Sequence, residues 1–342
     1  MKICIYGAGA IGGYLGVLLK RGGADVSLIA RGAHLEAIRK KGLALDMGGE
    51  RLVEQLPASS DPEDLGEQDY VIVALKAHQA WETAERMEPL LGARTAVVTA
   101  QNGVPWWYFH GLEGRYAGRR LPSVDPDDRQ WNAIGPERII GCTVYPATEI
   151  AEPGVVRHIY GNRFGLGEPG RTGSARVTAL AEVMTAGGLD ARVFDDIRDD
   201  IWLKLWGNLC FNPISALTRA TLDVVATSPG TRALARAMMM EAQEIGERLG
   251  ASFKVDVTRR IDGAAKVGAH RTSMLQDLEK GRQIELDALL TAVQDMARIT
   301  GVETPYIDAV LALTQQLGET FGVYPVYKTG ARAEAARVLQ SA

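Results

Sequence analysis

The sequence predicts an α/β domain followed by an all-α domain, and two patterns carry this prediction. In the first half of the 342-residue chain, short apolar runs of strand length alternate with segments whose apolar residues recur at helical spacing. After about Asp195 the strand-like runs stop and long helical patterns follow. Because single cores rarely grow beyond about 250–300 residues, a chain of this length is also expected to divide. We therefore predict one domain over residues 1–195 and a second over residues 196–342.

The first domain is expected to contain a doubly wound, largely parallel sheet. Strands that alternate with helices are joined by right-handed crossovers, and such crossovers connect parallel neighbours. The expected strands are Lys2–Tyr6, Asp25–Ala30, Tyr70–Leu75 and Thr95–Thr99, and the expected helices are Ala10–Arg21 and His34–Lys41.

Three later runs read as further strands joined by turns. They are Arg138–Tyr145, Gly154–Tyr160 and Arg163–Gly167, and the dipeptide Gly161-Asn162 between the last two is typical of a hairpin turn. We expect these strands to extend the sheet in an antiparallel direction.

The segment between Pro105 and Pro136 has no sustained period and is rich in aromatic, glycine and charged residues. Loops of this length are usually functional or disordered, and the aromatic run Trp106–Phe109 favours order. We expect a lid or a packing insertion.

The second domain is expected to be a set of long helices. Glycine and proline residues separate the periodic segments. The expected helices are Asp199–Phe211, Thr231–Leu249, Met274–Ile299 and Tyr306–Leu317.

Composition and charge exclude several classes of partner. The chain has 38 basic and 42 acidic residues, a net charge of −4, which gives no general attraction to nucleic acid or to an anionic membrane. No apolar run approaches the roughly 18 residues that a membrane span needs, and the N-terminus lacks a secretory pattern.

The three cysteines are far apart in apolar contexts, so we expect reduced thiols and no metal site. A cytoplasmic protein with a small-molecule ligand is favoured.

A glycine motif lies between the first strand and the first helix. The positions Gly7, Ala8, Gly9, Ala10, Ile11 and Gly12 match G-x-G-x-x-G in the strand-to-helix context that the motif requires. Its glycines permit a tight turn, close approach of a pyrophosphate and close helix–strand packing. The motif predicts a Rossmann domain that binds a dinucleotide.

Arg31 follows the second expected strand. An NAD site usually has an acidic residue there, whereas an arginine suits the 2′-phosphate of NADP. NADP(H) is therefore favoured over NAD(H), with a solvated loop cation as the alternative.

Lys76 and Asn102 follow two further strands, at the edge where such sheets bind ligands. Each could face the cofactor, although a polar residue at a strand end is equally often only solvated.

Lys204, Asn208 and Asn212 are four residues apart in an otherwise apolar segment, so they share one face of a helix. A lysine among apolar neighbours is costly without partners, which favours a polar cleft over the alternative of an exposed strip. Ser273 and Glu285 are expected at the start and in the middle of the helix over 274–299, where Glu285 could pair with a lysine or be solvated.

Taken together, these motifs resemble the ketopantoate reductase (2-dehydropantoate 2-reductase) family. The resemblance runs from residue 1 to about 320 and rests on ordered motifs in both predicted domains. They are GAGAIG at 7–12, Arg31, LKA at Leu75–Ala77, QNG at Gln101–Gly103, KLxxNxxxNP at Lys204–Pro213, and SMLQD followed by E-L-D at Ser273–Asp287.

The resemblance implies an N-terminal Rossmann domain and a C-terminal domain of the 6-phosphogluconate dehydrogenase C-terminal-like type, with NADPH and a 2-keto acid meeting in a cleft. By the same resemblance Lys204 is the general acid and Glu285 helps to organise the site. The resemblance further implies substrate contacts for Asn208, Asn212 and Ser273, with His270 where the family often has a substrate-contacting asparagine, and cofactor contacts for Arg31, Lys76 and Asn102. A homodimer is possible because helical domains offer apolar faces.

The implied reaction is NADPH-dependent reduction of 2-dehydropantoate to (R)-pantoate, a step of pantothenate biosynthesis. Three departures from the family lie near the expected substrate position: Pro105 with its aromatic insertion, Leu290-Thr291 where Asn-Gly is common, and His270. The alternative is therefore a reductase of a bulkier 2-keto acid, a D-2-hydroxyacid dehydrogenase, with Trp106–Phe109 as an apolar wall. A catalytically silent NADPH sensor is disfavoured by the presence of Lys204 and Glu285.

Overall fold

The computed structural model describes residues 1–171 and 173–325, and these fall into two compact units. Unit one comprises Met1–Leu205 with two later segments, Ile245–Phe253 and Asp287–Gly301. Unit two comprises Trp206–Glu244, Lys254–Leu286 and, of the described residues, 302–325. Unit one is α/β and unit two is helical, which confirms the predicted fold class. Residues 326–342, the end of the predicted second domain, lie outside the described residues.

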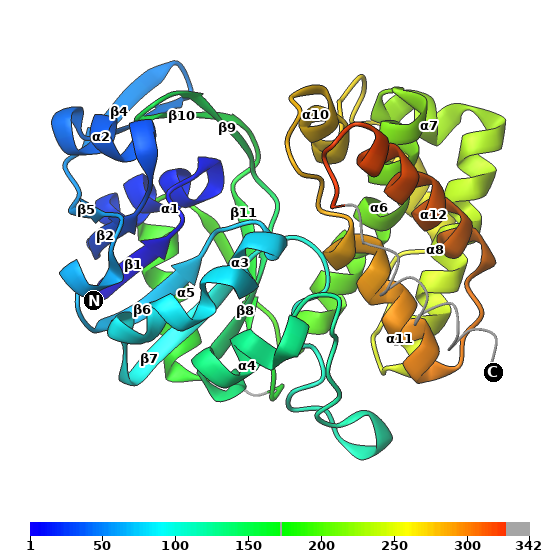
Figure 1. The fold of residues 1–342 in the computed structure, drawn as a ribbon, viewed down its shortest axis with the longest axis horizontal. Helices are drawn as coiled ribbons and strands as arrows, with labels where there is room; N and C mark the ends of the chain where they lie inside the picture. Colours follow the sequence, from blue (N-terminus) through cyan, green and yellow to red (C-terminus); the bar gives the residue numbers. More distant parts are fainter. Residues whose placement is uncertain (172, 326–342) are drawn as a thin grey trace. The chain divides into compact units, whose positions relative to one another are not determined.

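The larger sheet of unit one has the strand order β12-β11-β8-β7-β6-β1-β2-β5 (Figure 1). From β5 to β8 every neighbouring pair is parallel, while β11 runs antiparallel to β8. Because β2 and β6 flank β1 on opposite sides, the chain changes direction across the sheet at β1. The bounds are β1 Lys2–Tyr6, β2 Asp25–Ile29, β5 Ala58–Ser59, β6 Gln68–Val73, β7 Leu91–Ala100, β8 Ile139–Val144, β11 Arg163–Gly167 and β12 Asp190–Val193.

A smaller sheet with the order β4-β3-β10-β9 was not expected from the sequence. It contains β3 (Leu43–Met47), β4 (Glu50–Glu54), β9 (Ala147–Glu152) and β10 (Val155–Tyr160). The predicted hairpin across Gly161-Asn162 is therefore wrong: β10 pairs with β9 and β3, whereas β11 pairs with β8 and β12. The hairpin turn lies earlier, at Gly154, whose φ of 82° suits a tight turn.

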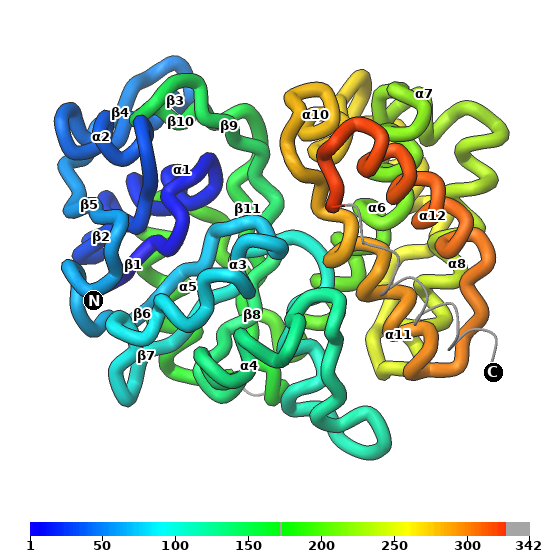
Figure 2. Tube along the Cα trace, viewed as in Figure 1, coloured from blue at the N-terminus to red at the C-terminus, as the bar shows by residue number. Residues whose placement is uncertain are grey.

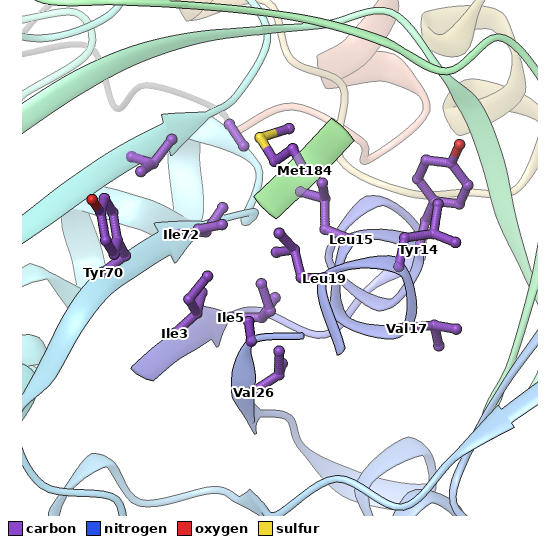
Figure 3. Packing of buried hydrophobic residues seen from close by; sticks show 14 of the residues in the cluster. Ile3, Ile5, Tyr14, Leu15, Val17, Leu19, Val26, Tyr70, Ile72 and Met184 are labelled. Carbon is purple, nitrogen blue, oxygen red and sulfur yellow. The ribbon is translucent and has the colours of Figure 1, made fainter. Parts of the chain in front are cut away.

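Helix α1 (Ala10–Arg21) lies against the larger sheet and also contacts the smaller one. Figure 3 shows Leu15 and Leu19 of α1 beside Ile5 and Ile72 of the large sheet. On the other side, a Cβ at Gly13 would lie 2.7 Å from Val156 of β10. A glycine is required here because the small sheet approaches the helix so closely. This packing fixes the N-terminal end of α1, where the glycine motif lies.

The aromatic run after β7 is buried among the larger sheet, α4 (Arg129–Ile134) and α6 (Ile197–Thr218). Trp106, Trp107, Tyr108 and Phe109 are each at most 3% exposed. The Trp107 indole donates a hydrogen bond to Thr99 of β7 at 2.9 Å. The segment further along, around residues 111–120, extends away from the sheet before the chain reaches α4 (Figure 2). The aromatic run is therefore part of the interior packing of unit one, in agreement with a packing insertion.

Helix α6 begins in unit one and continues into unit two. No helix among the described residues has the length and apolar character needed to cross a membrane. The helices not yet placed are α2 Gly32–Lys41, α3 Ala77–Thr83, α5 Ala175–Ala186, α6 Ile197–Thr218, α7 Leu222–Thr227, α8 Pro229–Arg248, α9 Val257–Ala265, α10 Ser273–Glu279, α11 Ala292–Thr300 and α12 Pro305–Thr320.

The long helix predicted over 274–299 is wrong. Helix α10 ends at Glu279, Gly281 has a φ of 62°, and the chain then runs without helix to a π-helical turn, Asp287–Thr291, that leads into α11. The backbone N–H of Arg282 donates to the Asp277 carbonyl of α10, and that of Ile284 donates to the Val323 carbonyl, after α12, at 3.0 Å, so backbone hydrogen bonds outside a helix hold this stretch. The sequence did not indicate this break, because apolar residues recur at helical spacing on both sides of it.

Candidate active site

The glycine loop has the geometry that a dinucleotide phosphate requires. Gly7 has a φ of 103°, which a residue with a side chain would rarely adopt. A Cβ at Gly12 would press on the Gly7 carbonyl and on Ile5, whereas a Cβ at Gly9 would meet no atom within 4 Å. Gly7 therefore permits the turn, Gly12 permits close packing, and Gly9 leaves open space beside the start of α1. The N–H groups at a helix start favour an anion, so these residues fit a pyrophosphate.

The other cofactor candidates also lie at the carboxyl ends of the parallel strands. Arg31 follows β2 and is the N-cap residue of α2, with an exposed side chain. Lys76 follows β6 and is the N-cap residue of α3, and Asn102 follows β7. Ligands of open α/β sheets bind at this edge, at the point where the strand order changes direction, which is β1 here.

Lys204 and Asn102 lie in direct contact. The Lys204 ammonium donates to Asn102 Oδ1 at 2.5 Å and to the backbone carbonyl of Val144 at the end of β8. The ring centroid of Tyr145 lies 5.6 Å from the same nitrogen. Lys204 is half-buried, and these contacts are incompatible with the alternative of an exposed strip at this position. The contact joins two residues that the sequence placed in different domains.

A pocket of unit one lies beside this contact. It is lined by polar groups of β7, β8 and the following loops and by two rings of the aromatic insertion. Tyr108 and Phe109 do not line it, so only part of the aromatic run could form an apolar wall. The lining includes Gln101, Asn102, Trp106, Trp107, Cys142, Thr143 and Lys204.

Unit two brings two of its candidates together. The Asn212 side-chain amide donates to Ser273 Oγ at 3.4 Å, and Asn212 is only 6% exposed. Ser273 begins α10, as predicted, next to the N-cap residue Thr272. Asn208 is half-buried on α6, one turn before Asn212. The His270 side chain is exposed.

Glu285 is not on a helix, contrary to the prediction. It lies in the stretch between α10 and the π-helical turn, where the backbone of the neighbouring Ile284 bonds to Val323. Its side chain is half-buried. The two family departures after it have structural roles: Leu290 is fully buried, and the Thr291 hydroxyl donates to Asp287 at 3.0 Å.

The cysteines are buried free thiols. Burial raises the pKa of Cys4, Cys142 and Cys210 to about 12 each. Because the thiolate is the reactive form, none of them is suited to nucleophilic chemistry.

Sequence reasoning missed Asp200, a buried carboxylate on α6 one turn before Lys204. It accepts hydrogen bonds from Thr143 and Tyr145, the residues on either side of Val144. The spacing of four residues from Lys204 was a visible signal, but the strand partners are more than fifty residues away.

Family models match both parts of the chain. The model described as "Ketopantoate reductase PanE/ApbA" matches residues 3–170, and the model of its C-terminal domain matches residues 196–318. The chain belongs to the ketopantoate reductase family. As a member it is a nicotinamide-dependent oxidoreductase.

Individual members of the ketopantoate reductase family resemble the chain over nearly its whole length. A protein of Mesorhizobium japonicum named 2-dehydropantoate 2-reductase is 57% identical over 95% of this chain and 100% of its own. A solved structure described as a putative ketopantoate reductase from Ralstonia solanacearum has a TM-score of 0.90 at 41% identity, covering 94% of this chain and 99% of its own.

A solved D-mandelate dehydrogenase with NADH and anilino(oxo)acetate has a TM-score of 0.80 at 23% identity, covering 94% of this chain and 100% of its own. At this identity the likeness shows the fold alone.

Proposed function

We propose that this chain reduces 2-dehydropantoate to (R)-pantoate with NADPH. The observation that carries the proposal is the contact of Lys204 with Asn102 at the carboxyl edge of the parallel sheet. The name and the 57% identity of the Mesorhizobium japonicum relative support this substrate.

The residues of unit one fit the cofactor. The glycine loop at 7–12 would hold the pyrophosphate, and Arg31 would hold the 2′-phosphate that distinguishes NADPH from NADH. Lys76 and Asn102 would lie along the same edge, toward the nicotinamide end. A bound nicotinamide supplies the hydride for carbonyl reduction.

Lys204 is the proposed proton donor. Reduction of a ketone leaves negative charge on its oxygen, so a nearby ammonium stabilises the transition state and then supplies the proton of the alcohol. The Asn102 side chain and the Val144 carbonyl each accept one N–H of the ammonium and so fix its direction. An ammonium held in this direction can give a proton to the oxygen of a bound substrate.

The unit-two candidates are proposed as substrate contacts. Asn212 and Ser273 already form one hydrogen-bonded pair, and neutral donors of this kind can orient hydroxyl and carboxylate groups. Asn208, His270 and Glu285 are proposed to act with them, Glu285 by organising the site.

A second candidate function is reduction of a bulkier 2-keto acid. Trp106 and Trp107 line the same pocket as Lys204, but at most 3% of either residue is exposed, so an aromatic substituent would need these rings to move.

A panel of 2-keto acids assayed with NADPH tests both proposals. We expect kcat/KM on 2-dehydropantoate to exceed that on an aryl 2-keto acid such as phenylglyoxylate at least tenfold, about 1.4 kcal/mol of transition-state binding. A higher kcat/KM on the aryl compound would replace the first function with the second. Reduction of neither compound would contradict both.

A further inference from the structure

Asp200 is a buried carboxylate whose hydrogen bonds converge on one end of β8. Its side chain is 1% exposed, in the first turn of α6. Oδ2 accepts from the Thr143 hydroxyl, and Oδ1 accepts from the Tyr145 hydroxyl at 3.0 Å and from the Arg163 guanidinium. A buried carboxylate is costly unless it is paired and hydrogen-bonded, and here three donors meet that need.

The strand that faces Asp200 has a glycine where any side chain would collide with this arrangement. Gly165 of β11 pairs with Thr143 of β8, and a Cβ on it would lie 2.5 Å from the Asp200 carboxylate and would also press on the Thr143 hydroxyl. Gly165 has no positive φ that would explain it. Its lack of a side chain makes room for the carboxylate.

Asp200 and Lys204 of α6 bind three consecutive residues at the carboxyl end of β8. Asp200 and Lys204 are one helical turn apart on α6, so they lie on the same side of the helix. Asp200 binds the side chains of Thr143 and Tyr145, and Lys204 binds the carbonyl of Val144, the residue between them. Two successive turns of α6 are therefore fastened to one short stretch at the carboxyl end of β8.

We infer that Asp200 is a positioning residue that fixes the Lys204 ammonium at the end of β8 by holding Thr143 and Tyr145 against α6. It does not itself reach the pocket, whose lining includes Thr143 and Lys204. This inference rests on the proposed role of Lys204 as the proton donor. Displacement of a reacting group by about 1 Å can cost about a hundredfold in rate, so loss of this anchor should reduce turnover.

The test measures kcat, KM and the dissociation constant of NADPH for Asp200→Ala and Asp200→Asn in the full chain. We expect Asp200→Ala to lower kcat at least tenfold while NADPH binding, followed by fluorescence titration, stays within twofold. Asp200→Asn should recover most of the lost kcat, because its carbonyl can still accept from Tyr145 and Arg163 while its amide donates to the Thr143 hydroxyl. A kcat within twofold of the unchanged enzyme for Asp200→Ala would overturn the inference.

Glu168 provides the matched control. It is also a buried carboxylate of unit one, and it pairs with Arg176 at 2.7 Å and with the Ser174 hydroxyl, at the opposite end of β8. Glu168→Ala should lower the melting temperature to a similar extent while kcat stays within twofold. An equal loss of kcat in both variants would show that Asp200 acts only through general stability, and the inference would be wrong.

If Asp200→Ala does not fold, a second variant tests the inference. Tyr145→Phe keeps the ring beside Lys204 and removes only the hydroxyl that donates to Asp200. We expect it to lower kcat about threefold to tenfold with NADPH binding retained. An unchanged kcat in this variant would contradict the inference.

The Lys204→Ala background separates this inference from the proposed function. If Asp200 acts through Lys204, Asp200→Ala should lower kcat no further once Lys204 is absent, whereas an independent effect would multiply. Wild-type turnover by Lys204→Ala alone would contradict the proposed function. A large loss in Lys204→Ala combined with full activity in Asp200→Ala would contradict only the role of Asp200.

Discussion

The two ends of strand β8 carry similar chemistry with different consequences. At the amino end, Arg176 pairs with the buried Glu168 and donates to the Arg138 and Ile139 carbonyls. At the carboxyl end, Arg163 pairs with the buried Asp200. Only the second pair lies at the edge of the sheet where the glycine loop, Asn102 and Lys204 are found.

This difference shows that a buried ion pair is not by itself a sign of function. Both carboxylates satisfy the same physical need, since each is paired with a guanidinium and bonded to a hydroxyl. What distinguishes them is their position relative to the carboxyl ends of the parallel strands, where open α/β sheets bind ligands. Substitutions at the carboxyl end should therefore change turnover or cofactor binding, and those at the amino end should change stability alone.

The largest expected effect belongs to Lys204 at the carboxyl end. Lys204→Ala should lower kcat by roughly 10²–10⁴, the usual scale for a lost general acid, because the ketone oxygen loses its proton donor. Steady-state kinetics with NADPH and 2-dehydropantoate measure this loss, and fluorescence titration should show nearly unchanged NADPH binding. Unaltered turnover would remove Lys204 from the mechanism.

At the amino end, Arg176→Met should destabilise the protein without affecting catalysis. It leaves the Glu168 carboxylate, whose side chain is 9% exposed, without its guanidinium partner. Because Arg176 is itself 32% exposed, we expect a loss of about 2–3 kcal/mol of unfolding free energy, below the 3–5 kcal/mol of a fully buried pair.

Urea denaturation measures this loss, and kcat should stay within twofold. The double variant Arg176→Met/Glu168→Gln serves as its control and should regain part of the stability, because no unpaired charge remains buried. A tenfold fall in kcat at full folding would break the distinction between the two ends.

The elements next to the carboxyl edge were the most predictable part of the fold. Helix α1 has the predicted bounds, Ala10–Arg21, because the glycine motif and the apolar spacing mark both ends locally. Pairing between distant segments was not predictable: β10 joins β3 and β9, and no local signal at Gly161-Asn162 distinguishes that from a hairpin with β11. The end of α10 at Glu279 was not predicted, because the apolar spacing of a helix continues through Gly281.

For the site, the sequence supplied the residue types but not the contacts. Lys204 and Asn102 were both singled out, yet their hydrogen bond joins positions 102 residues apart and depends on where α6 meets β7 and β8. Asp200 was missed for the same reason. The domain boundary near residue 195, the homodimer and the cytoplasmic location stay predictions.

The smallest expected effect is the loss of NADPH affinity on substitution of Arg31, which tests whether the carboxyl edge distinguishes NADPH from NADH. It follows β2 as the N-cap residue of α2, where its guanidinium can form paired hydrogen bonds with a 2′-phosphate. Arg31→Asp places a carboxylate there that repels the phosphate and suits the ribose hydroxyl of NADH. Fluorescence titration should show NADPH affinity falling at least tenfold, about 1.4 kcal/mol, with a much smaller change for NADH.

Lys40→Asp, near the other end of α2, makes the same change in net charge and should affect neither coenzyme. Equal losses for both coenzymes in Arg31→Asp would mean that Arg31 does not read the 2′-phosphate.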